Sequence, residues 1–322
     1  MWSLLTRSAV WAFTRVRYQR HSPGAANQHK SDSESVYTAC WHTWDLLINP
    51  RGIGWNWPRG LVIPKPTFET DSRLIFVLLL AAGVAFHALA FDVCVQSMRM
   101  LSPETFGSLR GGSLFDQSLP PVLELLRALL VSVLGTLSTY FGLQYTYQLL
   151  AIVCVVLFHH HPSQWPPLFN SPWLSTSLND LWGHRWHQMM RDMLLSLGGQ
   201  PFDYLFGRLG SVFGVFLASA IFHDIELRSS GRGGNSLGLV GFWMMQGIGV
   251  ILERVWKNVT GRSVGGVWGR MWMVGWLMFW GVPMANEYAK VGRFAALSLP
   301  GRLEPSLALV RLFSSVCGST AQ

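Results

Sequence analysis

Long stretches without any charged side chain are the feature that most limits what this chain can fold into. The longest runs from Ala128 to Asn179 without Asp, Glu, Lys or Arg, and its first part, Ala128 to Phe158, is continuously apolar. A charge at the centre of a bilayer is costly, and a helix of about 20 apolar residues crosses the roughly 30 Å of hydrocarbon. Such stretches predict helices that cross a membrane.

Five stretches have this character. They run from Leu74 to Phe91, Ala128 to Phe158, Leu209 to His223, Gly233 to Leu252 and Met271 to Asn286. The second is long enough to predict a tilted or broken helix, bending at Gly135 or Gly142. The third is short and is expected to extend on either side, through Arg208 and Asp224. We predict an all-α, multi-pass transmembrane helical bundle with about five spans, and at most about seven.

Composition agrees with this class. The 322 residues carry 25 basic and 17 acidic side chains, 13% in all, and the mean hydropathy is +0.27. A soluble chain carries about 25% charged residues. The net charge of +8 does not predict a nucleic-acid partner, because no basic run or interleaved basic and aromatic patch is present. The four Cys are scattered without CxxC spacing, which argues against a disulfide framework and a zinc site.

The ends of the chain differ from its centre. Four Arg precede residue 21, and no acid occurs before Asp32. This composition is that of a mitochondrial transit peptide, or of a basic segment that lies on an anionic membrane surface. We expect three parts: a basic N-terminal extension and interfacial segment (1–72), a membrane-embedded domain (73–290) and a C-terminal tail (291–322).

His223 is the clearest ionisable residue at a predicted span. It follows the uncharged segment 216–222, and at helical spacing it shares a face with Ser219 and Ser211. A neighbouring strip of small residues (Gly210, Gly214 and Ala218) would let another helix approach closely. A neutral imidazole accepts a proton from a hydroxyl near neutral pH, so His223 is a candidate general base. The alternative is a His that hydrogen-bonds across helices as part of the packing.

A second polar cluster follows the Pro-rich segment 162–172. Ser177 and Asp180 have the spacing of a helix N-cap, so a helix is expected to begin here, with Asp180, His184 and His187 on one side. Its Trp and Arg residues favour an amphipathic, interfacial helix. The spacing of these His, and of His159 to His161, does not match the repeated His boxes of membrane di-iron enzymes, so no metal site is predicted.

These residues carry a resemblance to a known family. Residues 165–169 read WPPLF and residues 177–188 read SLNDLWGHRWHQ, which is similar to WPPLF followed by SLxxFWGxxWHQ in the wax-synthase-like branch of the membrane-bound O-acyltransferases. Residues 218–224, ASAIFHD, resemble the family's apolar segment that ends in the active-site His. Weaker matches lie at 51–57 and 242–253. The whole resemblance covers roughly residues 40 to 290, and is greatest to fungal members that acetylate terpenoid and meroterpenoid hydroxyls.

The resemblance implies an acyl-CoA-dependent O-acyltransferase with no bound cofactor and with acetyl-CoA as co-substrate. His223 would be the general base on a lipophilic alcohol. His187 stands where the wider superfamily places a second polar residue, often Asn, and would orient the thioester. Supporting or substrate-binding roles are implied for further residues, which are Asn179, Asp180, Trp182, Arg185, Trp186 and Gln246. We expect a multi-pass membrane protein of the endoplasmic reticulum, with mitochondrial targeting as the alternative.

Other functions stay open at this point. One is a long-chain-alcohol wax-ester synthase. Another is a non-catalytic polytopic membrane protein, either a transporter or a truncated relative, because family members usually carry further spans before the segment that resembles 51–57. The expected partners are the acyl-CoA, the alcohol and membrane lipid; the sequence does not indicate an oligomeric state.

Overall fold

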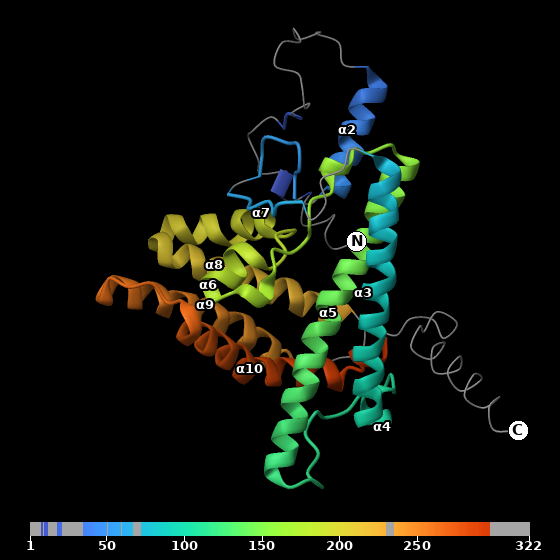
Figure 1. Cartoon of the computed structure of the whole chain (residues 1–322). Coiled ribbons are helices and arrows are strands. Elements are labelled where there is room, and N and C mark those ends of the chain that lie inside the picture. Colours follow the sequence, from blue (N-terminus) through green and yellow to red (C-terminus); the bar gives the residue numbers. More distant parts are fainter. Residues whose placement is uncertain are drawn as a thin grey trace, which may run out of the picture. The chain divides into compact units, whose positions relative to one another are not determined.

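The described part of the chain is built from helices (Figure 1). The computed structural model describes residues 8, 10–11, 18–20, 35–49, 51–58, 60–66, 72–229 and 235–296. Across these ranges there is no strand, only an isolated bridge between Arg20 and Trp55. The predicted all-α class is confirmed. Most of residues 1–34 and most of the tail lie outside the described residues, so the interpretation of the N-terminus as a transit peptide stays a prediction.

The longer helices are α2 (Val36–Ile48), α3 (Arg73–Leu101), α5 (Pro121–Leu157), α8 (Gln200–Ser229), α9 (Leu237–Thr260) and α10 (Gly266–Lys290). Short elements join them: α4 (Pro103–Phe106), α6 (Leu178–Asp180), α7 (Arg191–Leu194), α11 (Arg293–Ala296), the 3-10 turns η1 (Pro162–Gln164) and η2 (Pro172–Leu174), and the π-helical turns η3 (Leu181–Arg185) and η4 (Leu195–Gly199).

Four helical segments of the described chain are long and apolar enough to cross a membrane. They are α3, α5, the run Arg191–Ser229, which is kinked at Gly207 (φ 65°, ψ −163°), and α9. Each coincides with a predicted span, and the short third span extends on both sides as expected. The fifth predicted span, Met271 to Asn286, forms most of α10 but is not among the four. Its Trp and Gly residues lower its hydropathy without preventing the helix.

The second span was expected to be tilted or broken, and the break at Gly135 or Gly142 is not found. α5 is continuous over 37 residues, and the two glycines at which a bend was expected lie inside it. Both have a packing role instead. A Cβ at Gly135 would come within 3.1 Å of the Phe294 ring, and one at Gly142 within 3.3 Å of Phe91. These glycines let aromatic rings approach the helix backbone, and the helix keeps its hydrogen bonds.

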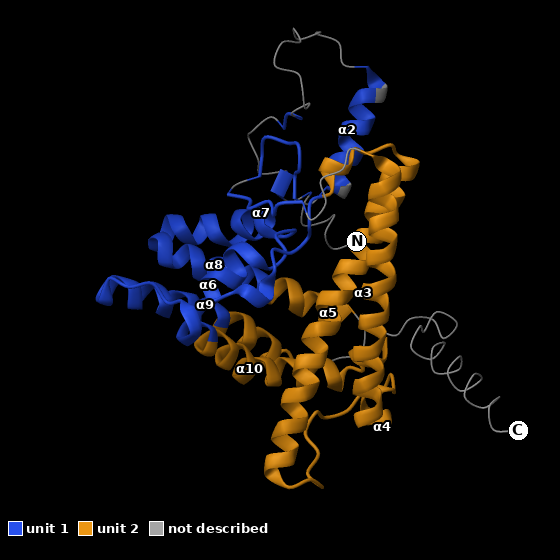
Figure 2. Cartoon of the chain, viewed as in Figure 1, with its two compact units in different colours: residues 1–67, 166–219, 246–270 blue, residues 68–165, 220–245, 271–322 orange. Residues whose placement is uncertain are grey.

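The chain divides into two compact units (Figure 2). Unit 1 comprises residues 1–67, 166–219 and 246–270, and unit 2 comprises residues 68–165, 220–245 and 271–322. The chain passes from one unit to the other within α8, α9 and α10. The three-part division predicted from composition (1–72, 73–290 and 291–322) separates the membrane-embedded part of the chain from its ends. The two units group residues by spatial contact instead, so the three-part division stays a prediction.

In unit 2, α3 and α5 lie side by side over most of their length (Figure 1). Their buried residues join a core with residues of α4, α10 and α11; it includes Phe91, Met98, Phe106, Val131 and Phe294. His87 of α3 adds a polar contact, because its Nδ1 lies 2.7 Å from the Gly83 carbonyl oxygen and 3.0 Å from Gln148 Oε1 of α5. Many outward Leu and Val side chains of both helices are exposed, as expected for surfaces that face lipid.

In unit 1, the predicted strip of small residues on α8 is confirmed as a place of close approach. Gly198 of η4 lies against Gly214 so closely that a Cβ on Gly198 would overlap the Gly214 carbonyl group. Ala218 Cβ would lie 2.9 Å from the same Cβ. η4 can reach α8 only because these side chains are absent or small.

Candidate active site

The predicted helix start at Ser177 is confirmed in unit 1. The Ser177 hydroxyl accepts a hydrogen bond from the backbone N–H of Asp180 at 3.0 Å and caps α6. α6 continues into the π-helical turn η3, which ends at Arg185. Trp186 follows with an extended backbone, φ −69° and ψ 160°.

His187 therefore does not lie on this helix, and the prediction that Asp180, His184 and His187 share one helical face is wrong for His187. The reason is local: the Trp186 N–H donates to the Leu181 carbonyl oxygen (2.8 Å), which closes a π-type turn and ends the helix. Asp180 and His184 do come together, with 3.8 Å between Oδ1 and Nδ1. The predicted amphipathic helix is limited to the short stretch 178–185.

Gln188, the residue that follows His187, is anchored by hydrogen bonds to two other segments of unit 1. Gln188 Nε2 donates to the Gly183 carbonyl oxygen at 2.6 Å, and Gln188 Oε1 accepts from the Val62 N–H at 3.3 Å. Arg191 donates to the same Gly183 oxygen at 3.4 Å. A loop from the N-terminal part of unit 1 and the turn η3 are thus both tied to the residue that follows His187.

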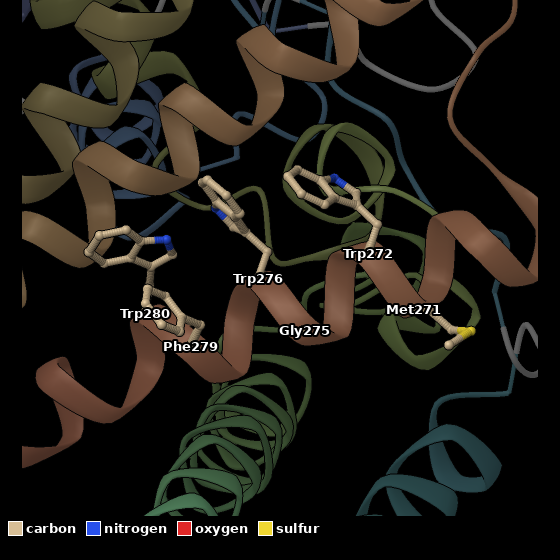
Figure 3. Close-up of a pocket in the computed structure, with 6 residues that line it drawn as sticks. All are labelled: Met271, Trp272, Gly275, Trp276, Phe279 and Trp280. Carbon is tan, nitrogen blue, oxygen red and sulfur yellow. The ribbon is translucent and has the colours of Figure 1, made fainter.

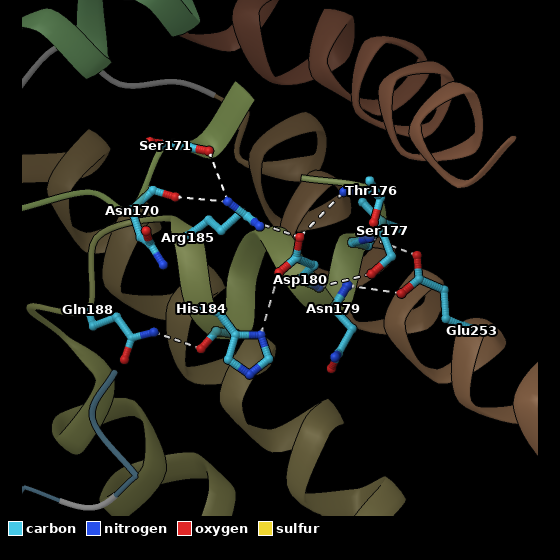
Figure 4. A network of polar contacts seen from close by, with 12 residues as sticks. Asn170, Ser171, Thr176, Ser177, Asn179, Asp180, His184, Arg185, Gln188 and Glu253 are labelled. Atoms are coloured by element: carbon cyan, nitrogen blue, oxygen red, sulfur yellow. Dashed lines mark hydrogen bonds and ion pairs between the residues drawn. The ribbon is translucent and has the colours of Figure 1, made fainter. Parts of the chain in front are cut away.

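Asp180 and Arg185 form the centre of a polar network (Figure 4). Arg185 Nε donates to Asp180 Oδ2 at 2.7 Å, and the same oxygen accepts from the Thr176 N–H at 3.4 Å. Arg185 Nη1 also donates to the backbone oxygens of Asn170 and Ser171, at 3.4 and 3.5 Å. The pair binds the loop before α6 to the turn after it.

Glu253 of α9 holds the beginning of α6, and the sequence did not single it out for this role. Its Oε1 accepts from the Leu178 N–H at 2.7 Å and its Oε2 from the Asn179 N–H at 2.9 Å. Glu253 is buried. A carboxylate at a helix N-terminus satisfies backbone N–H groups that have no partner within the helix. The available signal was an acid near the end of an otherwise uncharged predicted span.

Aromatic rings surround His187. The Phe169 and Trp186 rings lie 5.7 and 5.6 Å from the imidazole, centroid to centroid, and 4.8 Å from each other. Trp182 stands at 5.9 Å from Trp186 and donates its Nε1–H to Gln246 Oε1 at 3.3 Å. His187 and the residues predicted to support it, from Asn179 to Trp186, belong to one unit.

Gln246 was predicted to support His223. It is fully buried in unit 1, and the hydrogen bond it makes is to Trp182. Its Nε2 has no hydrogen-bond partner in the described part of the chain. His223 belongs to unit 2, so the predicted role of Gln246 toward His223 stays a prediction.

In unit 2, His223 is held by α8 and α9. Its imidazole stacks on the indole of Trp243, with 4.5 Å between ring centroids and 7° between ring planes. Its Nδ1 is buried and lies 3.5 Å from Glu226 Oε2, one helical turn further along α8. The side chain as a whole is 28% exposed. The ring is therefore anchored through one face and one nitrogen, while other ring atoms stay accessible.

Glu226 has a second partner on its other oxygen. Glu226 Oε1 forms an ion pair with Arg293 of α11, and Tyr288 of α10 lies close to both. Burial raises the pKa of the Tyr288 phenol, and the Glu226 carboxylate raises it further, so the phenol stays neutral. The sequence analysis did not identify Glu226 or Trp243 as site residues. The i,i+3 spacing of Glu226 from His223 was the signal that could have identified Glu226.

α10 presents an aromatic face in unit 2 (Figure 3). Trp272, Trp276 and Trp280 are four residues apart and project from one side of the helix. With Met271, Gly275 and Phe279 they line an open, mostly apolar hollow of about 380 Å³. Trp276 is fixed by a hydrogen bond from its Nε1 to the Met245 carbonyl oxygen (3.0 Å).

Two of the segments that carry the resemblance are in direct contact in unit 1. Arg51, from the segment 51–57, is buried, and its guanidinium donates to the carbonyl oxygens of Pro166 and Pro167, each at 2.8 Å. The two segments are more than a hundred residues apart in sequence. The WPPLF segment is thus held by an Arg that the sequence had linked to it only through a weak match.

These features define a helical membrane protein in which two histidines have fixed surroundings. Residues 165–244 match the model of the membrane bound O-acyl transferase family. The range includes both His187 and His223. The resemblance noted in the sequence is confirmed by this match and by the relatives described next.

Similar proteins include fungal acetyltransferases. The chain is 25% identical over 256 residues to acetyltransferase atnC of Arthrinium sp, across 73% of this chain and 58% of that protein. It is 27% identical over 273 residues to acetyltransferase pyr8 of Aspergillus fumigatus, across 77% and 63%. A shorter match, 33% over 104 residues and 30% of each chain, is to acyl-CoA–sterol O-acyltransferase 1 of Arabidopsis thaliana.

The chain spans about three fifths of the length of the two fungal relatives that it matches. The comparison with solved structures found no match.

Proposed function

We propose that the protein transfers an acyl group, in the first place acetyl, from acyl-CoA to a hydroxyl of a lipophilic acceptor such as a terpenoid or meroterpenoid. One observation carries the proposal: the stretch that matches the O-acyltransferase family, 165–244, includes both candidate catalytic histidines. The names of the fungal relatives favour acetyl as the group transferred. The four membrane-length helices support a lipid-soluble acceptor, and we propose the endoplasmic reticulum as the membrane.

In the proposed reaction His223 acts as general base. Its accessible ring nitrogen accepts the proton of the acceptor hydroxyl while the hydroxyl oxygen attacks the thioester carbonyl carbon. A carbon–oxygen bond forms, the carbon–sulfur bond breaks, and the thiolate of CoA takes up the proton that His223 received. No covalent acyl-enzyme is needed, because the alcohol is itself the nucleophile.

His187 has a separate proposed role. Its imidazole donates a hydrogen bond that orients the thioester and stabilises negative charge on the carbonyl oxygen as the alcohol attacks. The Phe169 and Trp186 rings limit its rotation. Asp180 and Arg185 hold the turn before it, which supports the positioning role implied for them, and Gln188 binds the Gly183 carbonyl oxygen of that turn.

The aromatic face of α10 is a candidate contact for the acceptor. Indole rings pack well on flat apolar ring systems, and the hollow that they line is apolar over most of its surface. This supports a polycyclic acceptor over a flexible long-chain alcohol. The variants Trp272→Ala and Trp280→Ala test separately whether the α10 indoles contact the acceptor.

The experiment uses microsomes from cells that express the full chain. Acetyl-CoA labelled in the acetyl group is offered with a sterol, a prenylated polycyclic alcohol or a long-chain primary alcohol, and labelled ester is measured by mass spectrometry. A parallel series replaces acetyl-CoA by a long-chain acyl-CoA. We expect a mass gain of one acetyl group on a polycyclic alcohol.

His223→Ala is the decisive variant. If His223 is the base, ester formation falls by about 100- to 10,000-fold, the range that general-base removal costs. Unchanged transfer in this variant would exclude the assignment. Exclusive use of the long-chain donor and the long-chain alcohol would instead identify a wax-ester synthase, and no ester from any pair would contradict the proposed activity.

A further inference from the structure

A chain of charged contacts in unit 2 ends on the buried nitrogen of His223. Arg293 of α11 pairs with one oxygen of Glu226, and the other oxygen of Glu226 lies 3.5 Å from His223 Nδ1. α11 and this part of α8 are almost 70 residues apart in sequence. None of these contacts is required by the packing of an apolar helix, which would bury hydrocarbon in their place.

We propose that Glu226 is a positioning residue that sets which nitrogen of His223 carries the proton. The inference rests on the proposed function and deepens it, since it concerns the same base. A carboxylate accepts hydrogen bonds and cannot donate them when it is ionised. Glu226 therefore favours the tautomer with its proton on Nδ1, and this leaves the lone pair of Nε2 free for the hydroxyl proton.

At 3.5 Å the contact between His223 Nδ1 and Glu226 Oε2 is long for a hydrogen bond, and within the described residues Nδ1 has no hydrogen-bond partner. Catalytic hydrogen bonds are often long before substrate binds and shorten in the complex. When His223 accepts the proton of the acceptor it becomes a cation, and the charge of Glu226 then attracts it. The same charge helps to hold the imidazolium until its proton passes to the thiolate of CoA, after which His223 is neutral again.

Arg293 orients the carboxylate of Glu226. With Oε1 held by the guanidinium, Oε2 is the oxygen that faces His223. Trp243 acts on the same ring from its face, so that the imidazole has one nitrogen and one face fixed. Two separate restraints, from Glu226 and from Trp243, thus support a role of the ring orientation of His223 in the reaction.

The test compares Glu226→Gln with Asp116→Asn in the acetyl-transfer assay. Asp116 pairs with Arg127 in the same unit, so its variant also removes one ion-paired carboxylate. In Glu226→Gln the amide oxygen is drawn to Arg293, and the amide NH₂ then faces Nδ1 and favours the wrong tautomer. We expect kcat to fall by about 100- to 10,000-fold with KM unchanged within about twofold, as for a carboxylate that holds a catalytic His. Asp116→Asn leaves kcat within about twofold.

Two further variants separate positioning from stability. Glu226→Asp keeps the charge and is expected to restore at least a tenth of the activity. In the double variant Glu226→Gln with His223→Ala, the residual rate equals that of His223→Ala alone, because Glu226 acts only through His223. A merely structural role would lower that residual rate further.

A second measurement does not depend on turnover. In protein labelled with ¹⁵N-histidine, the signal that disappears in His223→Ala reports the tautomer of His223. We expect an unprotonated Nε2 in the wild type and a protonated Nε2 in Glu226→Gln. Wild-type kcat in Glu226→Gln, or an unchanged tautomer, overturns the inference while the proposed function stands. Absence of transfer by the wild type contradicts the proposed function and leaves the tautomer measurement as the test of Glu226.

Discussion

The imidazole of His223 and the indole of Trp243 are nearly parallel, with 4.5 Å between their centroids and 7° between their planes. The two residues come from different helices, α8 and α9, which are separated by residues that lie partly outside the described chain. Stacking fixes the plane of the imidazole, and an indole face also stabilises a cation placed over it. Trp243 is thus placed to stabilise both the neutral and the protonated form of the proposed base.

Trp243→Ala is expected to lower kcat by about 5- to 30-fold, the equivalent of about 1 to 2 kcal/mol of stacking and cation–π energy. Trp243→Phe keeps an aromatic face and should retain most of the rate. Trp268, which is 80% exposed on α10, provides the control, because Trp268→Ala removes an indole without a packing role. Equal rates in Trp243→Ala and the wild type would show that the stack is unrelated to turnover.

Gly198→Ala is expected to destabilise the fold, since the added Cβ would overlap the backbone carbonyl of Gly214. Overpacking of this kind costs about 1 to 3 kcal/mol. Gly183→Ala is the matched control: a Cβ there meets nothing within 4 Å, and the stability should change by less than about 0.5 kcal/mol. The thermal unfolding midpoints of the detergent-solubilised variants give the comparison, and a wild-type midpoint for Gly198→Ala would show that η4 can move away from α8.

The membrane helices were predictable because a bilayer excludes charge, and this leaves a signal in the sequence itself. The Ser177 cap was predictable for a similar reason, because its partner is three residues away. The unbroken course of α5 was not, since it depends on Phe91 and Phe294 filling the space beside its glycines. Local patterns cannot show which residues of other helices come close.

The same distinction applies to the candidate site. His223 and His187 stand out in the sequence because polar residues are rare around the predicted spans. The residues that hold the site in place do not: Trp243, which stacks on His223, is one of 16 Trp, and Glu253 binds the Leu178 N–H across 75 residues of sequence. The end of the helix before His187 was also missed, because a π-type turn has no simple sequence signature.

Glu253→Gln is expected to weaken the anchoring of α6. The carboxylate accepts one N–H on each oxygen, whereas an amide can accept on one only and brings its NH₂ against the second N–H. Hydrogen bonds to a buried charged group contribute about 1.5 to 3 kcal/mol, so the unfolding midpoint should fall accordingly. Arg254→Gln changes the next residue, which is bonded weakly at the surface, and should have little effect. If both variants have the unfolding midpoint of the wild type, Glu253 does not hold the start of α6.

His187→Asn tests whether the second histidine moves a proton or only donates a hydrogen bond. An Asn side chain donates through its amide and cannot act as a base near neutral pH. If His187 orients the thioester, the Asn variant should keep kcat within about tenfold, while His187→Ala loses about 100- to 1,000-fold, as when one oxyanion donor is removed. His184→Asn is the control, because His184 is 51% exposed and lies on the helical turn that ends before His187.

Equal losses in His187→Asn and His187→Ala would contradict the hydrogen-bonding role and indicate proton transfer. Wild-type activity in His187→Ala would remove His187 from the site. An intermediate result with a raised KM for acyl-CoA, and unchanged KM for the alcohol, would identify the donor as the substrate that His187 contacts.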